Sequence, residues 1–178
     1  MKVYQYLTEH DVNQLRAWHA WLDDNRADRA QLRRAQSPED ILLSPAFAHF
    51  LGRMPERWQD PGTINLLDAA MVSAVLARVK IDDVKHSFAT ALAMPKESAG
   101  RAAMSELRFQ QLQKSRTPED FFRRICRAVA LLGGKANIAS LADDILQWLL
   151  EYRYAPERRP DQRLALRWAT DYYTALKD

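Results

Sequence analysis

One segment decides the fold: residues 64–80, with the sequence INLLDAAMVSAVLARVK. It is the most apolar run of the chain, and Asn65, Asp68, Ser73 and Arg78 interrupt it. A membrane span needs about 20 predominantly apolar residues, so these interruptions argue against one. Placed on a helix, the run is apolar on most sides, which is typical of a buried helix. We therefore predict that this segment is the central helix of a small bundle.

The remaining segments repeat their apolar residues with helical spacing, and none alternates convincingly as a strand. Thr8 is placed to cap a first helix, with Asp11 three residues later. Further helices are expected around residues 28–35, 37–44, 47–51, 86–94, 101–114, 118–132, 138–152 and 161–176. Residues 95–100 combine Pro, Lys, Glu, Ser and Gly, which indicates a linker. We predict an elongated all-α protein with two small helical bundle domains, 1–95 and 96–178, joined by this linker.

The composition is that of a folded and weakly basic protein. Of its 178 residues, 47% are hydrophobic, which is enough to bury a core. The net charge is only +3, so its basicity must be local to matter. Cys126 is the single cysteine, which fits a reducing compartment, and Phe121 and Phe122 beside it suggest a packed thiol. We expect a cytoplasmic protein, because residues 1–7 are too short and too polar for a secretory signal.

Two stretches of the chain are built alike, with several basic residues ahead of a Ser/Thr-Pro-Glu-Asp quartet. The quartets are residues 37–40 and 117–120. In each, the hydroxyl can cap free N–H groups, and proline suits the first helical position. The two carboxylates face the positive end of the helix dipole. Each quartet therefore predicts a helix start. Because capping explains the acids, the arginines have no matching partners in the sequence, which points to an anionic partner outside the chain.

The basic residues around the quartets are the candidate binding residues. A guanidinium group can grip two phosphate oxygens and keeps its charge, so rows of unpaired arginine fit a nucleic-acid backbone. Arg101 and Arg108 are seven residues apart on a predicted helix, and Arg159, Arg163 and Arg167 form a second row. The alternative is a solvated helix face or pairing with acids elsewhere in the fold. For the rows together we favour nucleic acid, with a candidate set of Arg33, Arg34, Arg101, Arg108, Lys114, Arg116, Arg123, Arg124, Arg127, Arg158 and Arg159.

Enzyme signatures are missing from the sequence. The four histidines show no metal-ligand spacing with each other or with Cys126. The five glycines are scattered and form no phosphate-binding loop. Asp143 and Asp144 are adjacent, and adjacent acids on a helix point in different directions and are usually solvated. We predict no catalytic residue, no metal and no cofactor.

The aromatic side chains are expected in the core. Trp18, Trp148, Trp168, Phe47 and Phe50 all lie on apolar stripes. This placement favours packing over base stacking, and disfavours an RNA module that reads sequence through stacked bases.

Seven stretches, in order along most of the chain, resemble the CasB family. They are WHAWL (18–22), RAQLRRA (29–35), SPED (37–40), PAF (45–47), ALA (91–93), ELRFQQL (106–112) with the basic block 116–127 that follows it, and LRWATDYY (166–173). That family is the small subunit of the type I-E CRISPR surveillance complex, Cascade. The resemblance implies two small helical domains in an elongated all-α protein without catalytic activity. The matched basic positions are Arg34, Arg108 and Arg124.

The resemblance also implies partners. They are the backbone filament and the large subunit of Cascade, a second copy of the chain arranged head to tail, target DNA and, as a further candidate, CRISPR RNA. No membrane is expected. The basic surface would hold DNA strands and stabilise the R-loop that forms when the guide pairs with its target. Two alternatives remain open: a helix-turn-helix DNA-binding regulator, and a structural adaptor whose basic faces meet acidic proteins.

Overall fold

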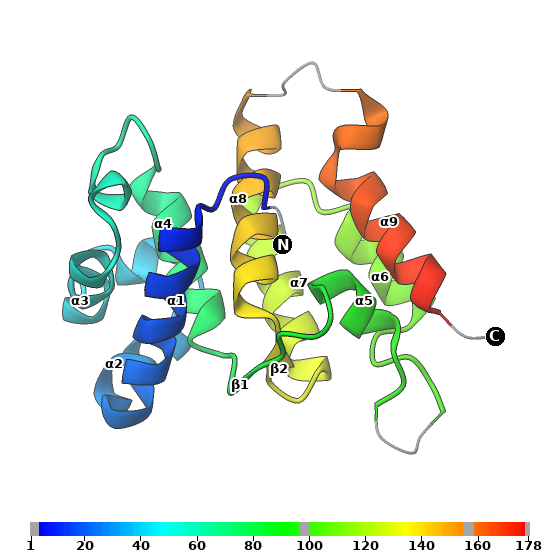
Figure 1. Ribbon diagram of the computed structural model, residues 1–178, viewed down its shortest axis with the longest axis horizontal. Helices are drawn as coiled ribbons and strands as arrows, with labels where there is room; N and C mark the ends of the chain where they lie inside the picture. Colours follow the sequence, from blue (N-terminus) through cyan, green and yellow to red (C-terminus); the bar gives the residue numbers. More distant parts are fainter. Residues whose placement is uncertain (1–3, 97–99, 155–158, 177–178) are drawn as a thin grey trace.

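The computed structural model describes residues 4–96, 100–154 and 159–176. The α-helices are α1 (Glu9–Trp21), α2 (Arg26–Arg33), α3 (Pro45–Arg53), α4 (Leu66–Leu76), α5 (Phe88–Ala93), α6 (Glu106–Gln113), α7 (Pro118–Leu131), α8 (Ile138–Tyr154) and α9 (Leu164–Ala175). Short 3-10 helices are η1 (Leu22–Asp24), η2 (Pro38–Ile41), η3 (Glu56–Gln59) and η4 (Pro160–Gln162). The prediction of an all-α protein is confirmed (Figure 1).

Two very short strands, which the sequence did not predict, accompany the helices. The strands β1 (Ile81–Asp82) and β2 (Lys135–Ala136) pair in parallel. The carbonyl of Gly134 accepts the N–H groups of Lys80 and Ile81, at 2.7 and 3.1 Å. Gly134 has φ +80°, a left-handed conformation that suits glycine at the end of a helix. This pairing ties the chain after α4 to the chain after α7.

The core is built around α4 and α8, which lie side by side (Figure 1). Every residue of α4 from Asp68 to Leu76 is buried, as predicted for the segment 64–80, although the helix itself is shorter. Helix α8 is buried from Ile138 to Gln147. Helix α9 packs against α8 and also against α5, so the apolar cluster continues from one half of the chain into the other. The division into domains 1–95 and 96–178 stays a prediction.

Both quartets begin helices, as predicted. Residues 37–40 lead into η2, where Asp40 accepts the N–H of Gln36 at 2.8 Å. Residues 117–120 lead into α7, where the Thr117 hydroxyl accepts the N–H of Asp120 at 3.1 Å. The predicted cap of α1 is also present, since Thr8 and Asp11 form a reciprocal capping box.

The prediction of one helix over 101–114 is wrong at its start. Helix α6 begins at Glu106, after Ser105 caps it. The residues before it are held by the end of α5 instead: the N–H of Ala103 donates to Met94, and that of Met104 to Leu92, each at 2.9 Å. Arg101 therefore lies outside the helix and does not share a helical face with Arg108.

Asp143 and Asp144 are buried rather than solvated, because nearly all sides of α8 are covered. Asp143 accepts the backbone N–H groups of residues 5, 6 and 7 at 2.7–3.1 Å, which fixes the start of the chain to α8. Asp144 accepts the indole N–H of Trp168 at 2.7 Å. Its other oxygen lies 2.8 Å from Nη2 of Arg167, a nitrogen that donates to Gln147 at 2.6 Å. Both acids are therefore part of the packing.

Asp144 makes the stability of the protein depend on pH. Burial raises the pKa of Asp144 to about 6, although Arg167 acts to lower it. The unfolded chain has an ordinary aspartate pKa of about 3.9, so the folded state holds this proton more tightly. The stabilisation from Asp144 is therefore complete below pH of about 4 and is lost as pH rises through about 6.

We expect Asp144→Asn to reduce the gain in stability on acidification. Between pH 7.5 and pH 5, the free energy of unfolding should rise by about 1 kcal/mol less in the variant than in the unmodified protein. Urea unfolding at both pH values measures this. The control is Asp24→Asn, an exposed acid, which should behave like the unmodified protein. An unchanged pH dependence in Asp144→Asn would show that the buried carboxyl stays charged across this range.

Candidate nucleic-acid interface

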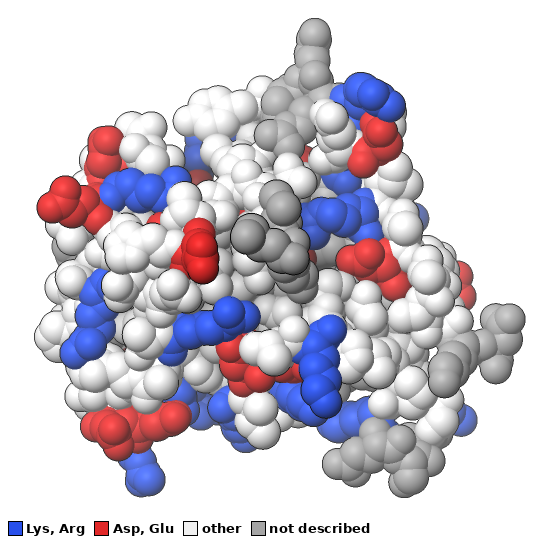
Figure 2. Space-filling model, in the orientation of Figure 1, with Lys and Arg blue, Asp and Glu red and all other residues white. Residues whose placement is uncertain are grey.

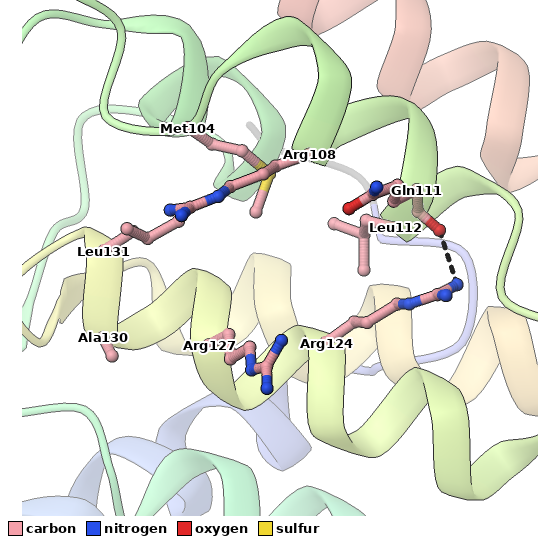
Figure 3. Close-up of a pocket in the computed structure, with 8 residues that line it drawn as sticks. All are labelled: Met104, Arg108, Gln111, Leu112, Arg124, Arg127, Ala130 and Leu131. Atoms are coloured by element: carbon pink, nitrogen blue, oxygen red, sulfur yellow. Dashed lines mark hydrogen bonds between the residues drawn. The ribbon is translucent and has the colours of Figure 1, made fainter.

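A pocket of about 380 Å³ lies between α6 and α7 (Figure 3). Its walls come from α6, from α7 and from the segment just before α6. The lining residues are Met104, Arg108, Gln111, Leu112, Arg124, Arg127, Ala130 and Leu131. The pocket therefore combines apolar side chains with three arginines.

The three arginines come from both helices and are held differently. Arg108 runs from α6 toward Leu131, and Arg124 runs from α7 toward Gln111, so the two cross the pocket in opposite directions (Figure 3). Arg124 is half-buried and donates to the carbonyl of Gln111 at 2.7 Å. Arg108 and Arg127 are exposed. Among the described residues, no carboxylate pairs with any of the three.

Other arginines of the chain do have acidic partners, which corrects the expectation that they lack them. Arg123 of the candidate set pairs with Asp120, and Arg159 lies 3.0 Å from Asp161. Arg167, in the predicted C-terminal row, lies beside Asp144. Hydrogen bonds to the helix ends do not fully occupy the capping carboxylates. An acid in the first turn of a helix also faces the side chain three residues later.

The rest of the candidate set is spread over the surface. Arg33 and Arg34 are exposed at the end of α2, and Arg34 lines a separate hollow with Asp28 and Asp40. Two exposed residues, Lys114 and Arg116, belong to the turn between α6 and α7, and Arg101 is exposed before α6. Arg158 lies outside the described residues. The structure thus brings Arg108, Arg124 and Arg127 together around one pocket, and places Arg34 in another.

Arg78, which sequence reasoning did not select, links α2 to α7. Its guanidinium donates to the carbonyls of Arg33 and Ala35, both at 2.8 Å, and to Ala74 at 2.6 Å. It also lies 5.2 Å from the ring centre of Phe122. Burial lowers the pKa of Arg78. The sequence did offer a signal for Arg78, because it lies inside the most apolar run of the chain, where a charged group needs partners within the protein.

The sequence did not point to two lysines near the C-terminal end of α7, the end opposite its Thr117 cap. A second hollow is lined by Lys96, Gly133 and Lys135, and also by Asp83 and His86. The two hollows adjoin, because Met104 and Leu131 line the first while their chain neighbours Ala103 and Leu132 line the second. The glycine pair at the end of α7 was the available signal. It marks the negative end of the helix dipole, where lysines are favoured.

Other chemistry finds little support in the described residues. Burial raises the pKa of the Cys126 thiol to about 11, which suits packing and not nucleophilic attack. The described ranges contain no group of three or more His, Cys, Asp or Glu side chains that could hold a metal ion. None of the described helices is long and apolar enough to cross a membrane.

The aromatic residues lie where the sequence predicted. Trp18, Trp168, Phe47 and Phe50 are buried, and Trp148 is half-buried and stacked on Phe121 at 4.2 Å between ring centres. The pocket between α6 and α7 has no aromatic lining residue.

Charge is mixed on the face drawn in Figure 2, where acidic and basic side chains are interspersed. Helix α7 lies behind α8 in that orientation (Figure 1). The small net charge of +3 therefore does not produce one basic surface over the whole molecule. Any grip on an anion must come from local groups such as the three pocket arginines.

Comparison with known proteins identifies the family. The family model described as CRISPR-associated protein Cse2 matches residues 28–173. The chain belongs to this family. Cse2 and CasB are names of the same family, whose members are non-catalytic small subunits of the CRISPR complex Cascade. The predicted family is confirmed, and the other Cascade subunits follow as partners of the Cse2 family.

A solved structure supports the same assignment. The crystal structure of CasB from Thermus thermophilus matches with a TM-score of 0.61 and 25% identity, over 94% of this chain and 97% of that chain. No curated protein matches the chain. The Cse2 match includes every residue that lines the pocket between α6 and α7.

The different roles of Arg124 and Arg127 predict different costs of truncation. We expect Arg124→Ala to lower the free energy of unfolding by about 1 kcal/mol, because the charged hydrogen bond to the end of α6 is lost. Arg127→Ala, on the same helix and with an exposed side chain, should change stability by within about 0.5 kcal/mol. Urea unfolding of both variants measures the difference, and equal values would contradict the assigned roles.

Proposed function

We propose that this protein is the small subunit of a type I-E Cascade complex that binds nucleic-acid backbone without sequence preference and stabilises the R-loop on target DNA in antiviral defence. One observation carries the proposal: Arg108, Arg124 and Arg127 surround a single pocket and have no carboxylate partner in the described ranges. Three cationic groups without a neutralising carboxylate at one place favour an anionic ligand.

The chemistry of the arginines fits phosphate. A guanidinium group offers several donors in a fixed fork and stays charged at any physiological pH. In RNA-guided complexes, base pairing reads the sequence, so the protein need only grip the backbone. R-loop formation is nearly balanced in energy, and a few phosphate contacts are therefore enough to change how long it persists.

The adjoining hollow extends the proposed track. Lys96 would contact a phosphate beyond the arginines, near the end of α7, while Lys135 shares the hollow with Asp83. The expected partners are the backbone and large subunits of Cascade, a second copy of the chain placed head to tail, target DNA and, as a further candidate, CRISPR RNA. The protein works without catalysis, metal or cofactor in this proposal.

The double variant Arg108→Glu with Arg127→Glu tests the proposal, since both side chains are exposed and should leave folding intact. We expect affinity for random duplex DNA to fall about tenfold or more at low salt. The slope of log affinity against log salt should shrink by about 2, at about 0.9 per phosphate contact. In reconstituted Cascade, the R-loop should dissociate faster while CRISPR RNA is retained.

The matched control is Arg26→Glu with Arg163→Glu, which makes the same change in net charge at exposed positions outside the pocket. It should retain most of the affinity. Equal losses in the two double variants would mean that only overall charge matters. A clear sequence preference would favour the DNA-binding regulator, and absence of DNA binding would favour the adaptor.

A further inference from the structure

The floor of the pocket between α6 and α7 is apolar, which phosphate binding does not need. Met104 and Leu112 are only 3% and 1% exposed, and their side chains close the pocket from the α6 side (Figure 3). Leu131 and Ala130 continue the apolar lining on α7. A backbone phosphate is fully charged and prefers water or cations, so it gains nothing from these side chains.

The cations lie around this apolar floor. Arg108 and Arg124 span the gap between the helices in opposite directions, and Arg127 lies on the α7 side of the pocket (Figure 3). A nucleotide has the complementary construction, with a flat apolar base attached to a charged phosphate. Resting on the proposed function, we propose that this pocket takes one unstacked nucleobase of a single strand while its arginines hold the phosphates of the same strand.

The arginines can also contact the base itself. A guanidinium plane stacks on the face of a nucleobase, through cation–π attraction that every base supports. The orientation of Arg124 is already fixed by its hydrogen bond to Gln111, so little side-chain freedom is lost on binding. The exposed amide of Gln111 offers a donor and an acceptor at the edge of the pocket. The binding is therefore tolerant of base identity.

The ligand must be a single strand, because the bases of a duplex are stacked and paired. Extruding one from a duplex costs a few kcal/mol, whereas a displaced strand offers its bases freely. The pocket thus distinguishes a displaced strand from closed duplex DNA, which phosphate contacts alone do not.

The test compares short oligothymidylate with an abasic oligomer of the same length, which has the same phosphates and no bases. The unmodified protein should bind oligothymidylate about fivefold more tightly, a smaller gain than aromatic stacking gives. The variant Ala130→Leu enlarges an exposed side chain on the α7 edge of the pocket without changing charge, and should remove the preference for oligothymidylate. The control Ala48→Leu places the same side chain on an exposed site of α3 and should behave like the unmodified protein.

The outcomes separate this inference from the proposed function. Equal binding of both oligomers by the unmodified protein would overturn the base pocket and leave the phosphate grip intact. Loss of duplex binding in Ala130→Leu would also overturn it, because the duplex presents no free base. Failure to bind any of the nucleic acids would overturn the proposed function itself. Displacement of oligothymidylate by an acidic, aromatic-rich peptide at similar concentration would assign the pocket to a protein partner instead.

Discussion

Every polar group on the two buried helices, α4 and α8, has to find a partner inside the protein, and the rest of the structure depends on this constraint. A buried charge without a partner costs several kcal/mol, so each acid on these helices binds a distant segment. Asp68 of α4 accepts a hydrogen bond from Arg153 at the far end of α8, at 2.9 Å. Asp143 fixes the start of the chain, and Asp144 receives Trp168 of α9. The buried acids therefore set how the outer segments dock onto the two central helices.

The same constraint decides which arginines remain available. Buried acids bind three arginines of the chain. Asp11 binds Arg57, Asp68 binds Arg153, and Asp144 lies beside Arg167. Arg78 donates hydrogen bonds to the carbonyls at the end of α2. Arg108, Arg124 and Arg127 escape this pairing, because α6 and α7 expose one side and the acids of α7 lie in its first turn, where Asp120 pairs with Arg123. Among the described residues, three arginines without a carboxylate partner are therefore left around one pocket.

The position of α6 relative to α7 gives the candidate site its character. Ser105 starts α6 late, so Met104 becomes part of the pocket floor instead of a helix face. Arg124 then fastens α7 to the end of α6. The result is a gap with an apolar floor and cationic edges, which suits the two chemical parts of a nucleotide. The Cse2 family assignment supplies the assembly in which such a site would act.

The sequence by itself determined the helical class, the quartet helix starts, the buried central segment and the resemblance to the family. These follow from apolar periodicity and from capping, which act between residues a few positions apart. It could not tell that Arg108 and Arg127 are free while Arg167 is used, or that residues 101–105 precede the helix. Those outcomes depend on contacts between residues far apart in the chain, such as Asp68 with Arg153, 85 positions away. Only the tertiary structure decides such pairings, because each one exists only when two helices pack at one particular place.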